Sequence, residues 1–255
     1  MFQYKNSYTL FFGLILIGIF AVFFISSEDV DNETEDVNKT ATSTEEKLSE
    51  SKEESSSGDS SNLVPPPLDR PVPSGTDTGI VEKILALTND VRANDADFGV
   101  WLDLASYRKV AGDIDGAKEI WIFMTKKFPF EIAPHINLGD LYHFNEKNYS
   151  LAEREYATAL SLNPTYFPLY LDIYEFYRYS YTEKAHLADD ALLDGLALGP
   201  SELPLLATLG AYYEETGDSK KAIEYYQKTA DEALLVGDID TRTRYLQKIS
   251  TLEGR

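Results

Sequence analysis

The distribution of apolar and charged positions divides this 255-residue chain into three parts. Residues 9–25 form an unbroken run of apolar or small residues without a charged side chain, which is typical of a membrane-spanning helix. Residues 28–78 are almost entirely polar, whereas apolar residues recur every three or four positions from residue 79 onward. That spacing is typical of amphipathic helices, so we expect an all-α domain from residue 79 to residue 255.

One combination of residues recurs within the helical part. A small residue follows a Leu, an Ala comes about twelve residues later, and an aromatic residue stands four places beyond that Ala. The clearest examples are Leu104, Ala105, Ala117 and Trp121; Leu138, Gly139, Ala152 and Tyr156; and Leu209, Gly210, Ala222 and Tyr226. Small residues allow two helices to pack closely, and the aromatic ring fills the space toward the next pair. Each pair must therefore stack on its neighbours to bury its apolar side.

This pattern resembles the tetratricopeptide repeat (TPR) family, whose repeats are stacked helix pairs. Together with the N-terminal pattern, the resemblance implies an all-α fold: a right-handed TPR solenoid of about four helix pairs with capping helices, preceded by one transmembrane helix and a disordered linker. The expected elements are a helix at 79–94, repeats at about 98–131, 132–165, 166–201 and 203–236, and a C-terminal capping helix at 239–253. Repeat two carries one extra residue near Asn148. Repeat three has Asp172 where a small residue is expected, and its turn at 178–183 is long.

The N-terminal part, residues 1–27, predicts a short cytoplasmic tip and an uncleaved anchor. The apolar run 9–25 is longer than the core of a typical signal peptide, and no A-x-A cleavage site follows it. Lys5 precedes the run and the next basic residue is Lys39, which favours a cytoplasmic N-terminus and an extracytoplasmic repeat domain. We expect a single-pass protein of the plasma (inner) membrane that contacts the lipid bilayer through residues 9–25. The alternatives are a cleaved signal, which would release a secreted protein, and a repeat domain that faces the cytosol.

Residues 28–78 are predicted to be an acidic, disordered linker. They contain 14 acidic and 4 basic residues, which leaves a net charge of −10. Such a composition buries too little apolar surface to offset the entropy of ordering, and its charge makes the segment extend. We therefore expect the repeat domain to be tethered near the membrane and free to move.

Composition and motifs argue against nucleic-acid binding and catalysis. The formal net charge of −20 at pH 7 opposes binding to nucleic-acid phosphates. The chain has no cysteine, its three histidines lack the spacing of metal ligands, and neither a G-x-S-x-G nor a Walker A motif occurs. We expect no enzymatic activity, no cofactor and no bound metal.

The resemblance assigns partner binding to a concave groove lined by the first helix of each repeat. The predicted partner-binding residues are Asn137, Asp140, His143, Tyr170, Ile173, Phe176, Tyr177 and Glu214. Of the residues with which some TPR proteins grip a C-terminal carboxylate, only Asn137 matches, and Asp140 and Glu214 would repel such a tail. Repeat three also concentrates aromatic residues: Tyr166, Phe167, Tyr170, Tyr174, Phe176, Tyr177, Tyr179 and Tyr181. Aromatic residues are enriched at binding hot spots, although packing between repeats is the alternative for most of these side chains.

Two functions follow as hypotheses. The first is a membrane-tethered scaffold or adaptor that binds a protein or peptide partner in the concave groove, similar to single-span bacterial TPR proteins with an extracytoplasmic repeat domain. The second is a structural subunit of a membrane or envelope complex, or of a homo- or hetero-oligomer, with the solenoid as a permanent interface. An exposed apolar patch on the convex face or the terminal helix would favour the second hypothesis.

Overall fold

The computed structural model describes residues 63–254, and this described part is all-helical, without a strand. The predicted anchor at 9–25 and most of the predicted linker lie outside these residues. Within the described part, no helix combines the length and the apolar character needed to cross a bilayer. The helices are α1 Thr78–Ala93, α2 Phe98–Val110, α3 Ile114–Lys127, α4 Ile132–Asp140, η2 Leu141–Glu146, α5 Tyr149–Leu162, α6 Pro168–Glu175, η3 Phe176–Ser180, η4 Thr182–Leu187, α7 Ala188–Leu198, α8 Leu203–Thr216, α9 Ser219–Leu235 and α10 Ile239–Glu253.

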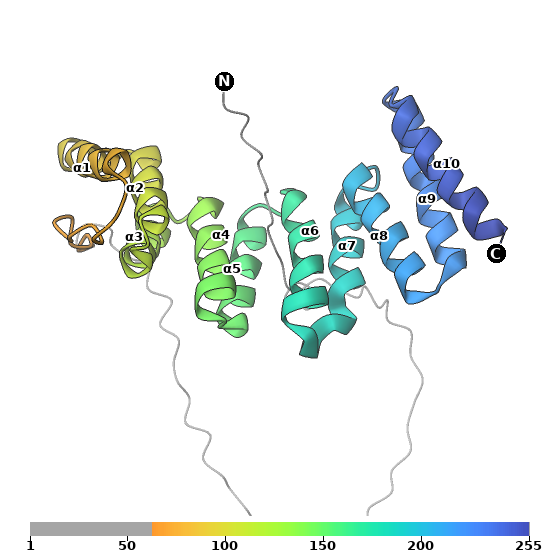
Figure 1. Cartoon of the computed structure of the whole chain (residues 1–255), viewed down its shortest axis with the longest axis horizontal. Helices are drawn as coiled ribbons and strands as arrows, with labels where there is room; N and C mark the ends of the chain where they lie inside the picture. The colour runs from red at the N-terminus through yellow and green to blue at the C-terminus, as the bar shows by residue number, and fades with distance from the viewer. Residues whose placement is uncertain (1–62, 255) are drawn as a thin grey trace, which may run out of the picture. The chain divides into compact units, whose positions relative to one another are not determined.

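Successive helices pack as pairs that follow one another along the chain (Figure 1). Helix α2 packs on α3, α4 on α5, α6 on α7 and α8 on α9, and these pairs correspond to the four predicted repeats. Contacts between α3 and α4 and between α7 and α8 join neighbouring pairs. Helix α1 packs against α2 before the first repeat, and α10 packs against α9 after the last. The predicted helical solenoid with an added helix at each end is therefore confirmed for the described residues.

Glycine and aromatic residues of the repeated pattern meet where the two helices of a repeat cross. Gly139 on α4 lies against the ring of Tyr156 on α5, and Gly210 on α8 lies against the ring of Tyr226 on α9. A Cβ atom at either glycine would overlap the ring. Tyr156 also contacts the next repeat, because its ring centroid lies 6.0 Å from that of Phe176. One aromatic side chain thus packs both within its own repeat and between repeats.

The extra residue of repeat two and the long turn of repeat three lie at the ends of the first helices of these repeats. Helix α4 continues into the π-helical turn η2, and α6 continues into the π-helical turn η3. A π turn holds one more residue than an α turn, which accommodates the extra residue of repeat two near Asn148. In repeat three, the long turn 178–183 is divided between η3 and the 3-10 helix η4.

Residues 63–77, assigned above to the disordered linker, lie against the first repeat. The guanidinium of Arg70 reaches two carboxylates, with Nε 3.0 Å from Oδ1 of Asp113 and Nη1 2.9 Å from Oε1 of Glu119. The side chain of Leu68 packs against the apolar core. The expected linker boundary at residue 78 therefore differs from the structure, because this segment has its own apolar and ionic contacts with the repeats.

Candidate functional site

The first helices of the four repeats, α2, α4, α6 and α8, follow one another along the described domain. Helix α6 contacts α8 directly. Electrostatic interactions link Lys109 on α2 with Asp140 on α4, and Asp140 with Asp172 on α6. The predicted partner-binding residues all lie on these first helices or on the turns that continue them. The structure separates them into a buried group and a half-buried group.

Five of the predicted residues are buried: His143, Tyr170, Ile173, Phe176 and Tyr177. The hydroxyl of Tyr170 donates to the carbonyl of Pro164 at 2.9 Å. The hydroxyl of Tyr177 donates to the carboxylate of Glu153 at 2.6 Å. Side chains in the interior offer no surface to a partner, so the structure corrects their expected binding role. Their positions support the alternative interpretation, packing between repeats.

Phe176 is the centre of an aromatic cluster that joins repeats two and three. Its ring centroid lies 5.1 Å from that of His143 and 6.0 Å from that of Tyr156, with interplanar angles of 76° and 82°. Edge-to-face contacts of this kind stabilise a buried interface beyond the area they bury. Burial also lowers the pKa of His143 to about 4, so its ring is neutral at pH 7. The cluster therefore stabilises the packing of one repeat on the next.

The other three predicted residues are half-buried: Asn137, Asp140 and Glu214. Asp140 accepts a hydrogen bond from the hydroxyl of Tyr156 at 3.1 Å. Glu214 accepts one from the hydroxyl of Tyr226 at 2.6 Å and one from Nζ of Lys248 at 2.8 Å. In both repeats the aromatic residue of the sequence pattern thus holds a carboxylate of the first helix in a set orientation.

The carboxyl group of Asp140 has a raised pKa. Burial raises its pKa to about 6, although the charge of Lys109 and the hydrogen bond from Tyr156 act in the opposite direction. The neighbouring Asn137 donates from Nδ2 to the carbonyl of Ala133 at 2.9 Å. Repeat two therefore presents a fixed amide and a carboxyl group that is mostly ionised at pH 7.

Asp172 on α6 lies outside the predicted set and is only 4% exposed. Burial, and after it the charges of Asp140 and Glu175, raise its pKa to about 10. The carboxyl group is therefore neutral at pH 7. Its Oδ2 atom has no hydrogen-bond partner among the described residues. A buried polar atom without a hydrogen-bond partner lowers the free energy of unfolding.

A second group of aromatic and charged residues lies outside the predicted set; of its tyrosines only Tyr179 is exposed, whereas Tyr212 is half-buried and Tyr174 is buried. The guanidinium carbon of Arg178 lies 5.1 Å from the ring centroid of Tyr212, and Nη2 of Arg178 lies 3.6 Å from the carboxylate of Glu215. The ring of Tyr174 meets those of Tyr179 and Tyr212 edge-on, at 6.2 and 6.0 Å. Tyr179 is 61% exposed. We call these five residues the tyrosine–arginine cluster.

The density of aromatic residues in repeat three was the sequence signal for this cluster, but the choice among them required the structure. In η3, Phe176 and Tyr177 are buried, whereas Arg178 is half-buried and Tyr179 is exposed. The π turn shifts the register of the helix, so positions read from an α-helical template point to the wrong side chains. Tyr212 was missed because its partner Arg178 lies on a different repeat.

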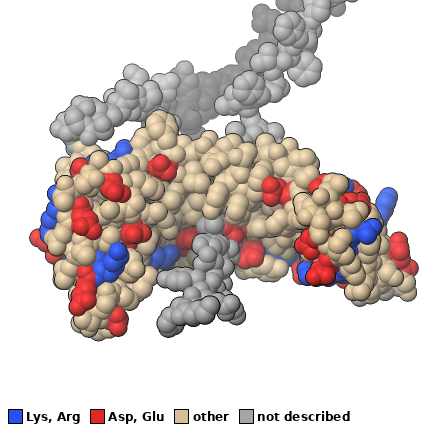
Figure 2. All heavy atoms as spheres, turned by 90° about the horizontal axis from the view of Figure 1, so that it is seen from above, with Lys and Arg blue, Asp and Glu red and all other residues tan. Residues whose placement is uncertain are grey.

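Charged groups of both signs lie along the first helices, with Lys109, Asp140, Arg178 and Glu214 in chain order. On the face of the domain seen from above, charged side chains gather mainly over the two ends, and the middle is mostly uncharged (Figure 2). Among residues 63–254, no group of His, Cys, Asp and Glu side chains is arranged to hold a metal ion. The arrangement suits aromatic, ionic and hydrogen-bonding contacts with a polypeptide.

Comparison with known families identifies two of the helix pairs. The family model described as tetratricopeptide repeat matches residues 133–166 and 203–229. These ranges cover α4 with α5, and α8 with most of α9. The chain contains tetratricopeptide repeats. The two matched TPR ranges coincide with predicted repeats two and four.

A solved structure adds one similar protein. A thermophilic TPR protein of Thermus thermophilus is 21% identical in sequence and matches with a TM-score of 0.43. The match covers 64% of this chain and 87% of that chain. No curated protein matches the TPR chain in sequence.

Proposed function

We propose that this chain is a membrane-tethered scaffold that binds a protein or peptide partner on the first helices of its TPR repeats. The tyrosine–arginine cluster carries the proposal, with Tyr179 and Glu215 exposed and Arg178 and Tyr212 half-buried. Tyr and Arg are among the residues most enriched at binding hot spots, because they supply large contact areas with polar groups at one end. TPR domains in general bind protein partners, which supports the same assignment.

The polar groups around the cluster favour a partner segment that combines apolar and basic residues. Glu214 and Glu215 lie beside the tyrosines on α8, and Asp140 provides a further carboxylate on α4. Glu214 and Glu215 are already paired with Lys248 and Arg178, but the three carboxylates together still favour a basic side chain over an acidic one. The partner segment we propose therefore places apolar side chains against Tyr179 and Tyr212, with basic residues next to the carboxylates.

The sequence supports the tether of this proposal. In our arrangement residues 9–25 span the plasma membrane, the N-terminus lies in the cytoplasm and the repeats lie outside it. Residues 28–62 carry 12 acidic and 3 basic residues. They connect the anchor to the repeats and repel anionic lipid headgroups, which keeps the binding surface away from the bilayer.

Site-specific photo-crosslinking in intact cells tests the proposal. The full chain is produced with a photo-reactive amino acid in place of Tyr179, or of the exposed Phe130 between α3 and α4 as the matched control. We expect irradiation to give one discrete adduct from position 179 and not from position 130, because only the first lies in the cluster. Protease added outside the cells should degrade the repeats and leave a short membrane-bound fragment.

An Arg178→Glu variant provides the decisive comparison. It reverses one charge beside Tyr212 on a half-buried side chain, so the thermal transition should stay within a few degrees of that of the unsubstituted chain. The adduct from position 179 should be lost. The proposal is wrong if positions 179 and 130 give the same adducts, or if the adduct persists in Arg178→Glu.

The alternative function, a structural subunit in a permanent assembly, is favoured by one observation. Large apolar side chains are exposed around the junction of α9 and α10: Leu234, Leu235, Val236, Ile239 and Leu246. Leu235 is 77% exposed. Exposed apolar side chains that gather at one end of a domain are typical of an interface with another polypeptide. The two functions are compatible, because the α9–α10 end can contact another subunit while the first helices bind a partner.

A further inference from the structure

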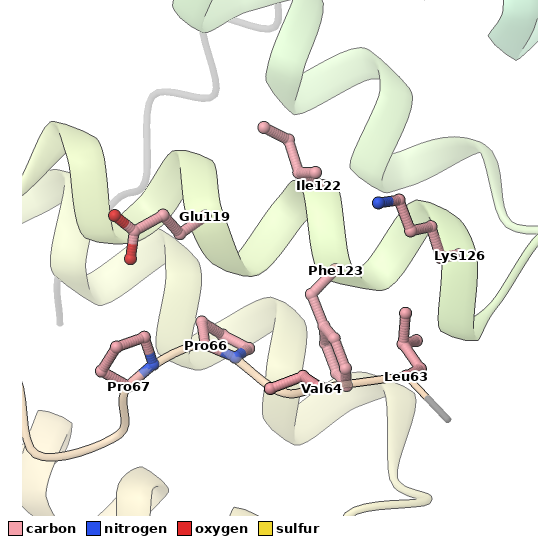
Figure 3. Close-up of a pocket in the computed structure, with 8 residues that line it drawn as sticks. All are labelled: Leu63, Val64, Pro66, Pro67, Glu119, Ile122, Phe123 and Lys126. Carbon is pink, nitrogen blue, oxygen red and sulfur yellow. The ribbon is translucent and has the colours of Figure 1, made fainter. Parts of the chain in front are cut away.

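Residues 63–72 form an extended strap, whose first part runs alongside α3 (Figure 3). They contain no helix or strand, only a turn at 68–69, and four of the ten residues are proline. The side chain of Phe123 points from α3 toward Val64 and Leu63. The strap therefore contacts the first repeat in the way that a bound peptide contacts a receptor.

The turn between α2 and α3 supplies fixed polar contacts for the strap. The buried Arg108, which is 2% exposed, pairs with Asp113 at 2.8 Å. Both terminal nitrogens of Arg108 lie 3.3 Å from the carbonyl oxygen of Arg70 and donate to it. The side chain of Arg70 in turn meets Asp113 and Glu119. One arginine of the receptor thus recognises the strap backbone, and two carboxylates recognise the strap arginine.

Between strap and helix there is an apolar cleft that the strap does not fill. Its volume is about 280 Å³. Its walls are Leu63, Val64, Pro66, Pro67, Ile122 and Phe123, with Glu119 and Lys126 at the rim. A peptide with larger apolar side chains than Val64 would bury more surface in this cleft.

From these contacts we propose that α2 and α3 form a second peptide-binding site, separate from the first helices of the other repeats. Its ligand is an extended, proline-rich segment of a partner protein with an arginine about six residues after an apolar residue. The strap occupies this site in the free chain and must be displaced. Proline-rich segments suit such recognition because they are already extended and lose little entropy on binding.

The strap is a strong competitor for its own site. Residues 73–77 connect it directly to α1, so its effective concentration is in the millimolar range or above. A free peptide in the micromolar range should therefore bind poorly to the unsubstituted chain. Weakening the strap while the receptor residues stay intact should expose the site.

The test uses a fluorescently labelled peptide with the sequence of residues 63–74 and the full chain. In the chain, Arg70→Glu places a carboxylate next to Asp113 and Glu119 and should release the strap. We expect the Arg70→Glu chain to bind the peptide at least tenfold more tightly than the unsubstituted chain, measured by fluorescence anisotropy. Asp69→Ala, at an exposed position of the same strap, is the matched control and should bind like the unsubstituted chain.

Two further arms identify the site. A peptide that carries Glu in place of its arginine should bind the Arg70→Glu chain at least tenfold more weakly. Adding Glu119→Lys to that chain should weaken binding of the original peptide similarly, since Glu119 is a receptor contact on an exposed part of α3. If Arg70→Glu lowers the helix content, Pro66→Gly with Pro67→Gly releases the strap without a change of charge.

The proposal is overturned if the peptide binds the released and the unsubstituted chains equally, or binds neither. It is also overturned if neither the replacement of the peptide arginine nor Glu119→Lys changes the binding affinity. None of these results bears on the tyrosine–arginine cluster, because the strap contacts α2 and α3 and the cluster lies on α6, η3 and α8.

Discussion

At the scale of single residues, the buried carboxyl group of Asp172 makes the free energy of unfolding depend on pH. Its pKa is about 10 in the folded chain against an ordinary value of 3.8, with burial as the main cause. Between these pH values the folded state keeps a proton that the unfolded chain has released. The contribution of Asp172 to stability therefore decreases as the pH rises from about 4 toward 10.

His143 has the opposite effect at lower pH. Burial lowers its pKa to about 4 from an ordinary 6.5, so the unfolded chain binds a proton more readily in that window. Its contribution to stability is lost as the pH falls from about 6.5 to 4. Asp172 therefore lowers the stability of this region as the pH rises, and His143 lowers it as the pH falls.

We predict that Asp172→Asn stabilises the chain at alkaline pH. The amide is neutral in both the folded and the unfolded state, whereas Asp172 must take up a proton on folding at pH 8, so the free energy of unfolding of the variant at pH 8 should exceed that of the unsubstituted chain. Near pH 4 the difference should disappear. Urea unfolding followed by circular dichroism at both pH values measures it, with the exposed Asp103→Asn as control. Equal stability of Asp172→Asn and the unsubstituted chain at pH 8 would contradict the assigned pKa.

At the scale of elements, the helix pair is held by a glycine against an aromatic ring. Gly210 on α8 touches the ring of Tyr226 on α9. The hydroxyl of Tyr226 is bonded to Glu214, so the ring cannot move away without losing that bond. Helix propensity favours alanine over glycine at position 210, but an alanine side chain there would overlap the ring of Tyr226.

We predict that Gly210→Ala lowers the thermal stability. Overpacking of a core typically costs about 1–3 kcal/mol, which exceeds the gain of at most about 1 kcal/mol from helix propensity. The melting temperature by circular dichroism should fall by several degrees. Gly99→Ala on α2 is the control, because its added Cβ would make only an ordinary contact of 3.4 Å with Asp97. A melting temperature of Gly210→Ala equal to that of Gly99→Ala would refute the argument.

At the scale of the whole molecule, the exposed apolar side chains near α10 raise the question of assembly. The chain carries a formal net charge of −20, which opposes association through general repulsion. Leu235 and Ile239 are nevertheless both exposed around the turn that joins α9 to α10. Burial of these side chains against a second polypeptide is the physical basis of the assembly function proposed above.

The assembly function predicts self-association that depends on this end of the molecule. The chain should sediment as an oligomer, and Leu235→Glu with Ile239→Glu should convert it to a monomer. Analytical ultracentrifugation at moderate salt measures the change, since salt screens the net charge. Leu198→Glu, at an exposed apolar position on α7, should leave the oligomer intact. A monomeric unsubstituted chain would exclude self-association through this end of the molecule and leave the scaffold function in place.

Much of the fold could be predicted because its determinants are local. The repeated Gly139–Tyr156 and Gly210–Tyr226 pairs lie within single repeats, so a fixed spacing in the sequence is enough to reveal them. The residues that we propose for partner binding were harder to predict. The π turn η3 shifts the register of repeat three, and the side chains of Phe176 and Tyr177 are buried while that of Tyr179 is exposed.

By itself, the sequence determined the helical repeat, its period and the acidic character of the chain, because these follow from residue types and spacing. Only the tertiary structure decided that Arg70 belongs to the folded domain. Its carboxylate partners stand 43 and 49 residues away in the chain, and no local composition reveals such a contact. Burial is likewise a property of the assembled helices, so only the structure could separate the aromatic side chains of the interior from those available to a partner.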